Sequence, residues 1–169
     1  VLVEGKSDVT FLRHAASSLK QSGMLPASLE DVKIVPVLIG GCGSVKHWVT
    51  LNLANDLGLP WCVFLDSDIG GDPAQVLSIQ KRKKEVEDAG KVFFATRKRE
   101  IENYLCPDLI EEMTGVAVTF TDTCDAKKII GRAVGMKPDN VLDKFWPRMT
   151  AERIISRSTY HDGMQERIE

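Results

Sequence analysis

The chain of 169 residues is long enough for one domain with a sizeable hydrophobic core and a small appendage. With 43% hydrophobic and 27% charged residues it has the composition of a soluble globular protein, which excludes an intrinsically disordered chain. Its apolar runs all fall short of the roughly twenty residues that span a membrane, and a formal net charge of -2 excludes a uniformly basic surface while leaving room for local basic patches.

The four cysteines stand at positions 42, 62, 106 and 124, and no two of them have the Cys-x-x-Cys spacing of a zinc site or redox pair. We expect all four to be reduced thiols, which favours a cytoplasmic protein. The chain begins directly on an apolar segment without an initiator Met. This start suggests an excised piece of a longer protein.

The first predicted strand, residues 1–4, is apolar and ends in a carboxylate, Glu4, followed by Gly5. Apolar residues at helical spacing then predict a helix over 8–21. Asp8 falls in its first turn, where an acid complements the helix dipole. Because Asp8 also follows Glu4 by four residues, it is equally a candidate for a shared metal site.

A second strand is expected over 32–39, followed by a helix over 45–56 and a third strand over 61–66. The third strand ends in Asp66 and Asp68, with two glycines behind them. In an extended chain these two side chains point to the same side, where they can share Mg²⁺ or Mn²⁺. The alternative is a solvated turn that Asp68 begins.

A proline-initiated helix is predicted over 73–88, capped by Asp72. It carries a basic run, Lys81 to Lys84, that suits either a solvated helix face or contact with phosphate. A fourth short strand over 91–95 then leads into Arg97-Lys98-Arg99 and the acids Glu100 and Glu102. Such neighbouring bases and acids suit a phosphodiesterase, or a helix start with balanced charge.

Beyond residue 107 the pattern is helical, with helices expected over 107–114, 125–134 and about 150–157, and a loop around 137–140. The aromatic pair Phe145-Trp146 is interpreted as core packing rather than as a platform for bases. We therefore divide the chain into a core over 1–115 and a helical appendage over 116–169.

Strands that alternate with helices predict an α/β fold with a mostly parallel sheet flanked by helices and a small helical C-terminal appendage. In such sheets ligands bind beyond the carboxyl ends of the strands. Each acidic segment follows a strand, so the acids are expected on one rim. The candidate metal ligands are Glu4, Asp8, Asp66, Asp68, Glu100 and Glu102.

Two sets of residues carry a resemblance to a known family. Val3-Glu4-Gly5 with Asp66-Ser67-Asp68 resembles the Toprim module of topoisomerases, primases and nucleases. Arg97 to Leu105 resembles the Arg-x-x-Glu-x-Glu-Asn-Tyr stretch of the OLD (overcoming lysogenization defect) family of ATP-dependent endonucleases. The resemblance implies a Toprim-like fold over the first two thirds of the chain.

The same resemblance implies a metal-dependent DNA endonuclease in which two Mg²⁺ or Mn²⁺ ions serve phosphodiester hydrolysis. Glu4, Asp66 and Asp68 are the acids expected to be catalytic, together with a downstream lysine. Lys127, Lys128 and Lys144 all qualify by type, and Lys144 is chosen. The residues expected to contact DNA are Lys81, Arg82, Lys83, Lys84, Arg97, Lys98 and Arg99. A preceding ATPase domain would supply ATP binding and a homodimer contact.

Two alternatives remain open. A topoisomerase or primase use of the module would require other parts, and strand passage needs a tyrosine nucleophile, for which Tyr104 and Tyr160 are the two candidates. A Toprim-like scaffold or nucleic-acid-binding module without activity would use the acids only to cap turns. Metal titration distinguishes the scaffold from the enzyme.

Overall fold

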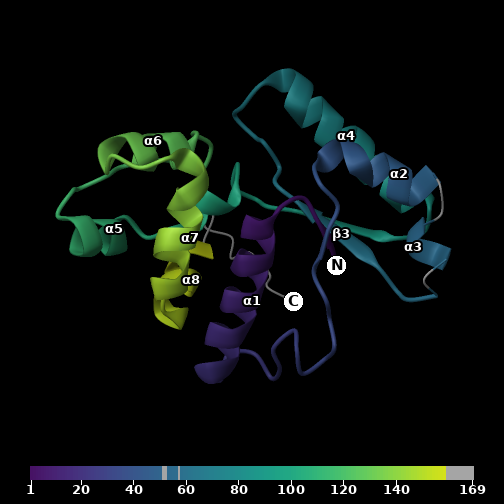
Figure 1. Ribbon diagram of the computed structural model, residues 1–169, viewed down its shortest axis with the longest axis horizontal. Coiled ribbons are helices and arrows are strands. Elements are labelled where there is room, and N and C mark those ends of the chain that lie inside the picture. Colours follow the sequence, from purple (N-terminus) through teal and green to yellow (C-terminus); the bar gives the residue numbers. More distant parts are fainter. Residues whose placement is uncertain (51–52, 57, 159–169) are drawn as a thin grey trace.

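The computed structural model describes residues 1–50, 53–56 and 58–158 (Figure 1). Its strands are β1 (Leu2–Val3), β2 (Val37–Leu38), β3 (Cys62–Leu65) and β4 (Val92–Ala95). Its α-helices are α1 (Lys6–Gln21), α2 (Val45–Thr50), α3 (Leu53–Asp56), α4 (Pro73–Asp88), α5 (Pro107–Thr114), α6 (Ala126–Ala133), α7 (Val141–Phe145) and α8 (Ala151–Ser158). Short 3-10 helices are η1 (Cys42–Ser44), η2 (Ile101–Tyr104), η3 (Pro138–Asn140) and η4 (Trp146–Arg148).

The four strands form one parallel sheet in the order β2-β1-β3-β4. Leu2 of β1 pairs with Val63 of β3, and Val63 pairs with Phe93 of β4. Parallel neighbours require crossover connections, and helices provide them here. The sheet confirms the predicted Toprim-like α/β fold and turns the carboxyl ends of all four strands toward one edge.

The second strand is much shorter than the predicted 32–39, because only Val37 and Leu38 pair with β1. The residues before them form a turn, in which the Ile34 amide donates to the Leu29 carbonyl over 2.8 Å. Lys33 there has a left-handed φ of 58°. A left-handed residue ends an extended run, so apolar composition alone was misleading for this segment.

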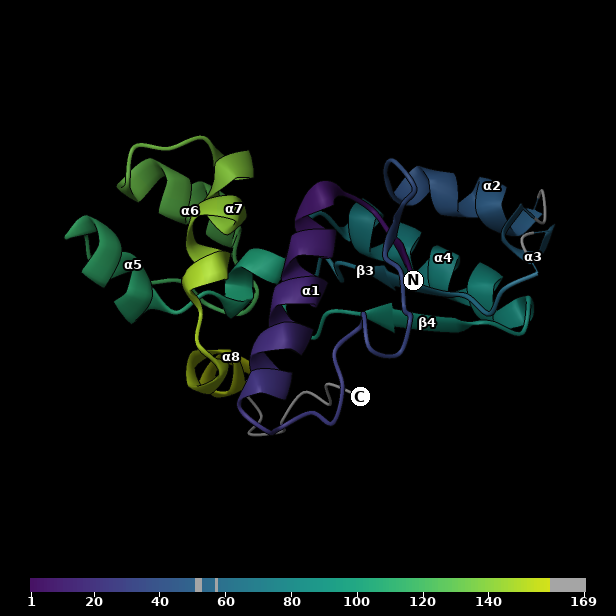
Figure 2. The same ribbon diagram turned by 60° about the horizontal axis from the view of Figure 1, so that its bottom comes forward.

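The core consists of two hydrophobic clusters. The smaller joins the sheet to α2 and α4 through buried residues such as Val63, Leu65 and Val86. The larger joins α1 to η2, α5, α6, α7 and α8. In both views (Figures 1 and 2) α1 stands between the sheet and the group of C-terminal helices. Residues on both sides of the predicted division at residue 115 share this larger core.

Phe11 of α1 connects the two halves of the fold. Its ring stacks on Trp146 at 4.4 Å between centroids and lies 6.1 Å from Phe64 of β3. The Trp146 indole N–H also donates to the Phe11 carbonyl over 3.1 Å. Phe145 and Trp146 are fully buried, which confirms that the aromatic pair belongs to the core.

The ends of several helices confirm the sequence predictions. The Asp72 side chain accepts a hydrogen bond from the Ala74 amide over 2.9 Å and caps α4. Gly115 ends α5 with a left-handed φ of 71°. Differences are small: the helix expected over 45–56 is described as α2 and α3, and the loop expected at 137–140 contains η3.

Cys62, Cys106 and Cys124 are free thiols, as predicted, while the side chain of Cys42 lies outside what the structure describes. None of the helices in the described ranges has the length and apolar character needed to cross a membrane.

Replacing Trp146 tests whether the C-terminal helices are integral to the fold. We expect Trp146→Ala to lower the free energy of unfolding by about 3–5 kcal/mol, because it opens a cavity against α1. The control is Lys144→Ala, an exposed residue of α7, with a change within about 0.5 kcal/mol. Urea unfolding followed by circular dichroism measures both. Equal stability of the two variants would contradict a shared core.

Candidate metal centre at the carboxyl edge of the sheet

The six predicted acids follow three strands of the sheet. Glu4 comes directly after β1, and Asp8 lies in the first turn of α1. Asp66 and Asp68 follow β3, and the remaining two acids, Glu100 and Glu102, follow β4 at the start of η2. Because β1 and β3 are paired and β3 and β4 are paired, their carboxyl ends bring these side chains to one edge.

Asp8 caps the start of α1 and also lies among the acids. Its Oδ2 accepts a hydrogen bond from the Gly5 amide over 2.8 Å, which fixes the start of α1. Burial, together with the charge of the nearby Glu4 carboxylate, raises the pKa of Asp8 to about 6. The side chain is therefore both a cap and a member of the acid group.

Asp66 is the acid whose pKa is raised by the largest number of the other acids. Its Oδ1 accepts a hydrogen bond from the Ile101 amide over 3.0 Å, which ties the end of β3 to η2. Burial raises the pKa of Asp66 well above the usual value, and the charges of Asp8 and Glu102 add to this effect. Such a carboxylate is stabilised by any cation that approaches it.

Asp68 does not continue the extended chain that the sequence analysis assumed. Its φ of 54° is left-handed, and its amide donates to the Arg99 carbonyl over 3.0 Å. The alternation of an extended strand therefore cannot place Asp66 and Asp68 on one side. Burial raises the pKa of Asp68, and Glu4 adds to this effect. Glu4 is thus the acid that acts most on Asp68, whereas Asp8 and Glu102 act most on Asp66.

The two glycines after Asp68 are required by close packing. A Cβ atom at Gly70 would lie 2.6 Å from the Thr123 carbonyl oxygen, and Gly70 also has a φ of 73°. A Cβ at Gly71 would lie 2.9 Å from the Asp68 carbonyl oxygen and 3.2 Å from the Arg99 guanidinium. The glycines therefore let the Asp68 loop approach both the 121–125 segment and Arg99.

Glu100 and Glu102 are both buried, with 3% and 6% of their surface exposed. Burial, together with the charge of Glu100, raises the pKa of Glu102 to about 7. Glu100 also raises the pKa of Asp66 and Asp68. All six acids are thus linked, because each one either raises the pKa of another acid or has its own pKa raised by one.

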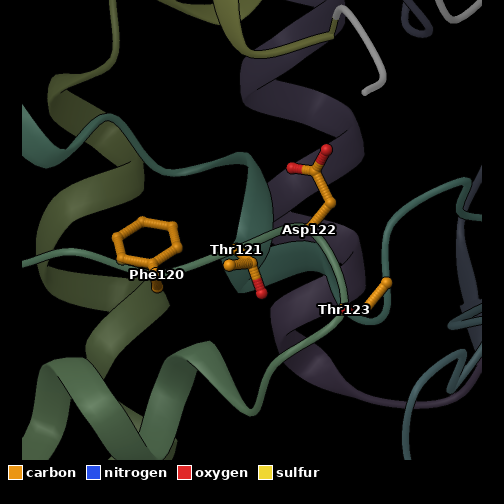
Figure 3. A pocket seen from close by; sticks show the side chains of 4 residues that line it. All are labelled: Phe120, Thr121, Asp122 and Thr123. Atoms are coloured by element: carbon orange, nitrogen blue, oxygen red, sulfur yellow. The ribbon is translucent and has the colours of Figure 1, made fainter. Parts of the chain in front are cut away.

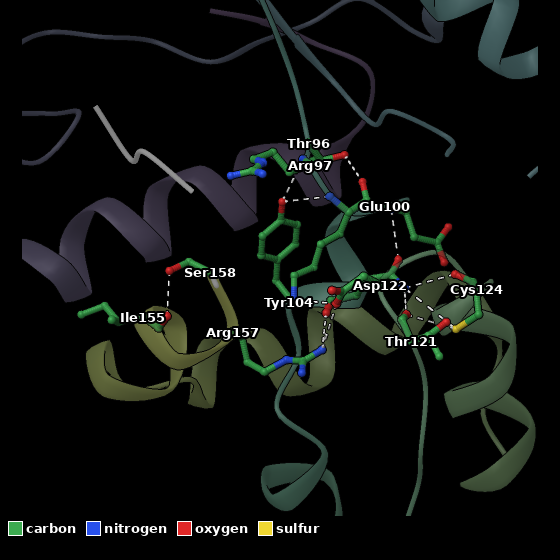
Figure 4. Close-up of polar contacts among 12 residues, drawn as sticks. Thr96, Arg97, Glu100, Tyr104, Thr121, Asp122, Cys124, Ile155, Arg157 and Ser158 are labelled. Atoms are coloured by element: carbon green, nitrogen blue, oxygen red, sulfur yellow. Dashed lines mark hydrogen bonds and ion pairs between the residues drawn. The ribbon is translucent and has the colours of Figure 1, made fainter. Parts of the chain in front are cut away.

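A buried hydrogen-bond network holds the segment between β4 and η2 in place (Figure 4). The Thr96 hydroxyl accepts from the Ser67 amide over 3.0 Å and donates to the Lys98 carbonyl over 2.7 Å. The Tyr104 hydroxyl accepts from the amides of Arg97 and Lys98 over 3.1 and 3.3 Å. The backbone that presents the acids is therefore fixed by its own side chains.

Asn103 performs the same function for the 121–125 segment. This fully buried side chain accepts from the Glu100 amide over 3.0 Å. It donates to the carbonyls of Thr121 and Cys124 over 2.7 and 3.1 Å. The acids after β4 and the segment before α6 are consequently held at a fixed distance from one another.

Lys98 was predicted to contact DNA, and the structure contradicts this. Its side chain is 1% exposed, and its ammonium lies 2.8 Å from Asp122 Oδ1. The same ammonium lies 5.2 Å from the centre of the Tyr104 ring. An ammonium buried with an acid and an aromatic face stabilises the fold and is not presented to a ligand.

The sequence favoured Lys144 as the lysine of the site. In the structure it is Lys127 that contacts one of the acids. Lys127 Nζ lies 2.9 Å from Glu100 Oε2. Lys144 is exposed on α7, where its ammonium lies 5.4 Å from the ring of its neighbour Phe145. The role assigned to Lys144 has no support in these contacts. Lys127 follows Glu100 by 27 residues, a separation that no local sequence pattern links.

The basic run of α4 is paired largely with acids of its own helix. Arg82 pairs with Glu85, Lys83 with Glu87 and Lys84 with Asp88. These pairs along an exposed helix favour the solvated-face interpretation over phosphate contact. Arg99 is placed differently, since its charge acts on Asp68 and its guanidinium lies against Gly71.

The donor set suits a hard divalent cation, because all six groups are carboxylates and their mutual repulsion is what such an ion would relieve. Within the described part of the chain, however, no three acidic, histidine or cysteine side chains are arranged to hold a metal ion as they stand. Several carboxylate oxygens are engaged elsewhere, by the Gly5 and Ile101 amides and by Lys127. The chemistry therefore fits, and the side chains have to reorient to close around an ion.

An open hollow lies beside the 121–125 segment, lined by Phe120, Thr121, Asp122 and Thr123 (Figure 3). The residues that line it include none of the six acids as far as the structure describes them. We therefore place the candidate centre at the edge of the sheet and not in this hollow.

The fold and the acids define an α/β domain with clustered carboxylates at the carboxyl edge of a parallel sheet. Residues 1–68 match the family model described as "Overcoming lysogenization defect protein-like, TOPRIM domain". The match includes Glu4, Asp8, Asp66 and Asp68, and it supports a Toprim domain of an OLD-family protein. It indicates a nucleic-acid-related, metal-binding domain of the nuclease or topoisomerase type. No curated protein and no solved structure matches the chain.

The raised pKa values predict how the stability of the metal-free protein depends on pH. Asp8 and Glu102 have pKa values of about 6 and about 7 in the folded chain, against roughly 4 when unfolded. The folded state therefore binds more protons, so the free energy of unfolding is highest near pH 4 and falls as the pH rises to 7.

Urea unfolding in EDTA at pH values from 4 to 8 measures this slope, and Glu102→Gln should flatten it because it removes one of the groups whose pKa is raised. Asp31, whose pKa is lowered to about 2 by its hydrogen bond to Lys20, acts in the opposite direction and mainly below pH 5. Stability that stays level or rises between pH 5 and 7 would show that these acids are not buried together.

Proposed function

We propose that this domain is a divalent-metal-dependent DNA endonuclease that hydrolyses phosphodiester bonds. The observation that carries the proposal is the convergence of six mutually repelling carboxylates at the carboxyl edge of a Toprim-like sheet. The family match over residues 1–68 supports it. In this proposal ATP binding and dimerisation belong to another part of a longer protein.

The acids interact in two overlapping sets, a number that suits two ions. Glu4 raises the pKa of both Asp68 and Asp8, and Asp8 and Glu102 raise that of Asp66. Mg²⁺ or Mn²⁺ held there would lower the pKa of a water molecule and neutralise charge on the phosphate. The residues of the chain hold the ions, exclude bulk water on the buried side and orient the substrate backbone.

Arg99 is the cation best placed to contact a phosphate next to the acids. Its backbone is fixed by the Asp68 amide on one side and, through its own amide, by the Asp122 carbonyl at 2.8 Å on the other. Its guanidinium lies beside Gly71 and 3.9 Å from Asp125. A planar guanidinium held in this way suits a phosphate oxygen better than a mobile lysine of α4.

The two alternative functions, a topoisomerase-type module and an inactive scaffold, are less well supported by the residues of the site. Tyr104 is 5% exposed, and its hydroxyl accepts two backbone hydrogen bonds, so it serves the fold and is poorly placed as a nucleophile for strand passage. Tyr160 lies outside the described residues. A scaffold without activity would not explain six acids that repel one another, because capping a turn requires only one carboxylate.

A plasmid assay tests the proposal directly. We expect the protein to nick supercoiled DNA in Mn²⁺ without ATP, and EDTA to abolish the activity. Asp66→Asn should abolish nicking while leaving the metal-free protein at least as stable as the parent, because the amide oxygen still accepts from Ile101 and one repelling charge is gone.

Asp72→Asn is the matched control, since Asp72 is exposed in the same loop and asparagine also caps a helix. It should nick DNA like the parent. An Asp66→Asn variant that retains both nicking and the Mn²⁺-induced rise in melting temperature would reject the metal role of Asp66.

The contribution of Arg99 is measured by DNA binding in Ca²⁺. Arg99→Gln should weaken binding for every DNA sequence alike and reduce the salt slope by about one, as expected when one phosphate contact is lost. Lys83→Ala is the control, because Lys83 pairs with Glu87 on α4, and it should change neither quantity. Melting curves of both variants verify folding. If Arg99→Gln binds DNA with the affinity and salt slope of the parent, Arg99 does not contact DNA.

A further inference from the structure

Lys127 occupies both oxygens of one acid in the cluster. Its ammonium lies 2.9 Å from Glu100 Oε2, and its backbone amide donates to Glu100 Oε1 over 3.1 Å. The Glu100 side chain is 4% exposed, whereas that of Lys127 is 36% exposed. The lysine therefore enters the buried cluster from solvent, with its stem anchored at the start of α6.

The charge of Lys127 reaches beyond its partner. It lowers the pKa of each acid whose pKa burial raises at this edge: Asp8, Asp66, Asp68 and Glu102. Burial by itself lowers the pKa of Lys127, but Glu100, Glu102 and Asp66 raise it well above its usual value. One ammonium thus interacts with five of the six acids, where a divalent ion would also have to sit.

We propose that Lys127 is the built-in counter-ion of the metal-free cluster, and that a divalent cation has to compete with its ammonium for these carboxylates. The identity of the ion rests on the proposed function. The ion pair between Lys127 and Glu100, together with the burial of Glu100 beside the other acids, carries the inference. A lysine side chain has a flexible four-carbon stem, so the ammonium is able to move toward solvent when an ion enters.

Removing Lys127 should affect metal binding differently from what is expected of a lysine that only contacts DNA or only stabilises the fold. If Lys127 only contacts DNA, its removal leaves metal binding unchanged in the absence of DNA. If it only stabilises the fold, its removal lowers the melting temperature equally with and without metal. If it is the counter-ion, its removal destabilises the metal-free protein and strengthens metal binding.

Calorimetric titration with Mn²⁺ and thermal melting, both on the full chain without DNA, test the inference. We expect Lys127→Ala to bind Mn²⁺ at least about tenfold more tightly than the parent, because a positive charge within the cluster is gone. Its metal-free melting temperature should be lower and its rise on adding Mn²⁺ larger. If Lys127→Ala does not fold without metal, Lys127→Gln keeps the length of the side chain without the charge and should show the same tightening.

Lys128→Ala is the matched control, because Lys128 is the next residue, is 68% exposed at the side chain and pairs with Asp125. It should bind Mn²⁺ like the parent. If the parent binds Mn²⁺ and neither Lys127 variant binds it more tightly, the counter-ion role is wrong while the proposed function stands. If the parent binds no Mn²⁺, the metal centre itself is wrong, and both proposals fail.

Discussion

Repulsion between buried carboxylates is the constraint on which the arrangement of this domain depends. Parallel strands end at one edge of the sheet, so acids placed after β1, β3 and β4 are forced together whether or not a cation is present. Burial, and after it the charges of the neighbouring acids, raises the pKa values of Asp8, Asp66 and Glu102. The cluster persists because rigid elements hold its backbone: Asp66 accepts from the Ile101 amide and Asp68 donates to the Arg99 carbonyl.

The C-terminal helices complete this frame and are not merely attached to it. The 121–125 segment, which precedes α6, accepts both hydrogen bonds of the Asn103 amide and receives the Lys98 ammonium at Asp122. The first turn of α6 then contributes Lys127 to the acids. A chain ending near residue 115 would retain the strands and the six carboxylates. It would lack the partners that fix η2 and the ammonium that offsets the charge of the cluster.

The sequence was most informative where local rules decide the structure. Apolar runs that end in acids predicted the strands and the acidic rim, and the capping residues Asp72 and Gly115 predicted helix ends. It was misleading where long-range contacts override those rules. Asp68 leaves the extended conformation because its amide pairs with Arg99, 31 residues later in the chain. Lys98 is buried although it stands in a basic run, because a partner acid lies 24 residues away at Asp122. No spacing rule connects residues that only the fold brings together.

Because most bases near the site are paired with acids, they contribute little positive charge to attract a nucleic acid. Lys98, Lys127 and three bases of α4 each have a partner acid, so the metal-free edge presents more carboxylates than cations, with Arg99 beside them. A phosphate backbone approaching that edge is repelled. On the proposed function, divalent ions reverse the sign of this interaction, because each adds two positive charges where the acids lie. Metal binding and DNA binding are then coupled, and the coupling is reciprocal: an ion that strengthens DNA binding is itself held more tightly when DNA is present. The acids that destabilise the empty site are thus the source of its dependence on metal.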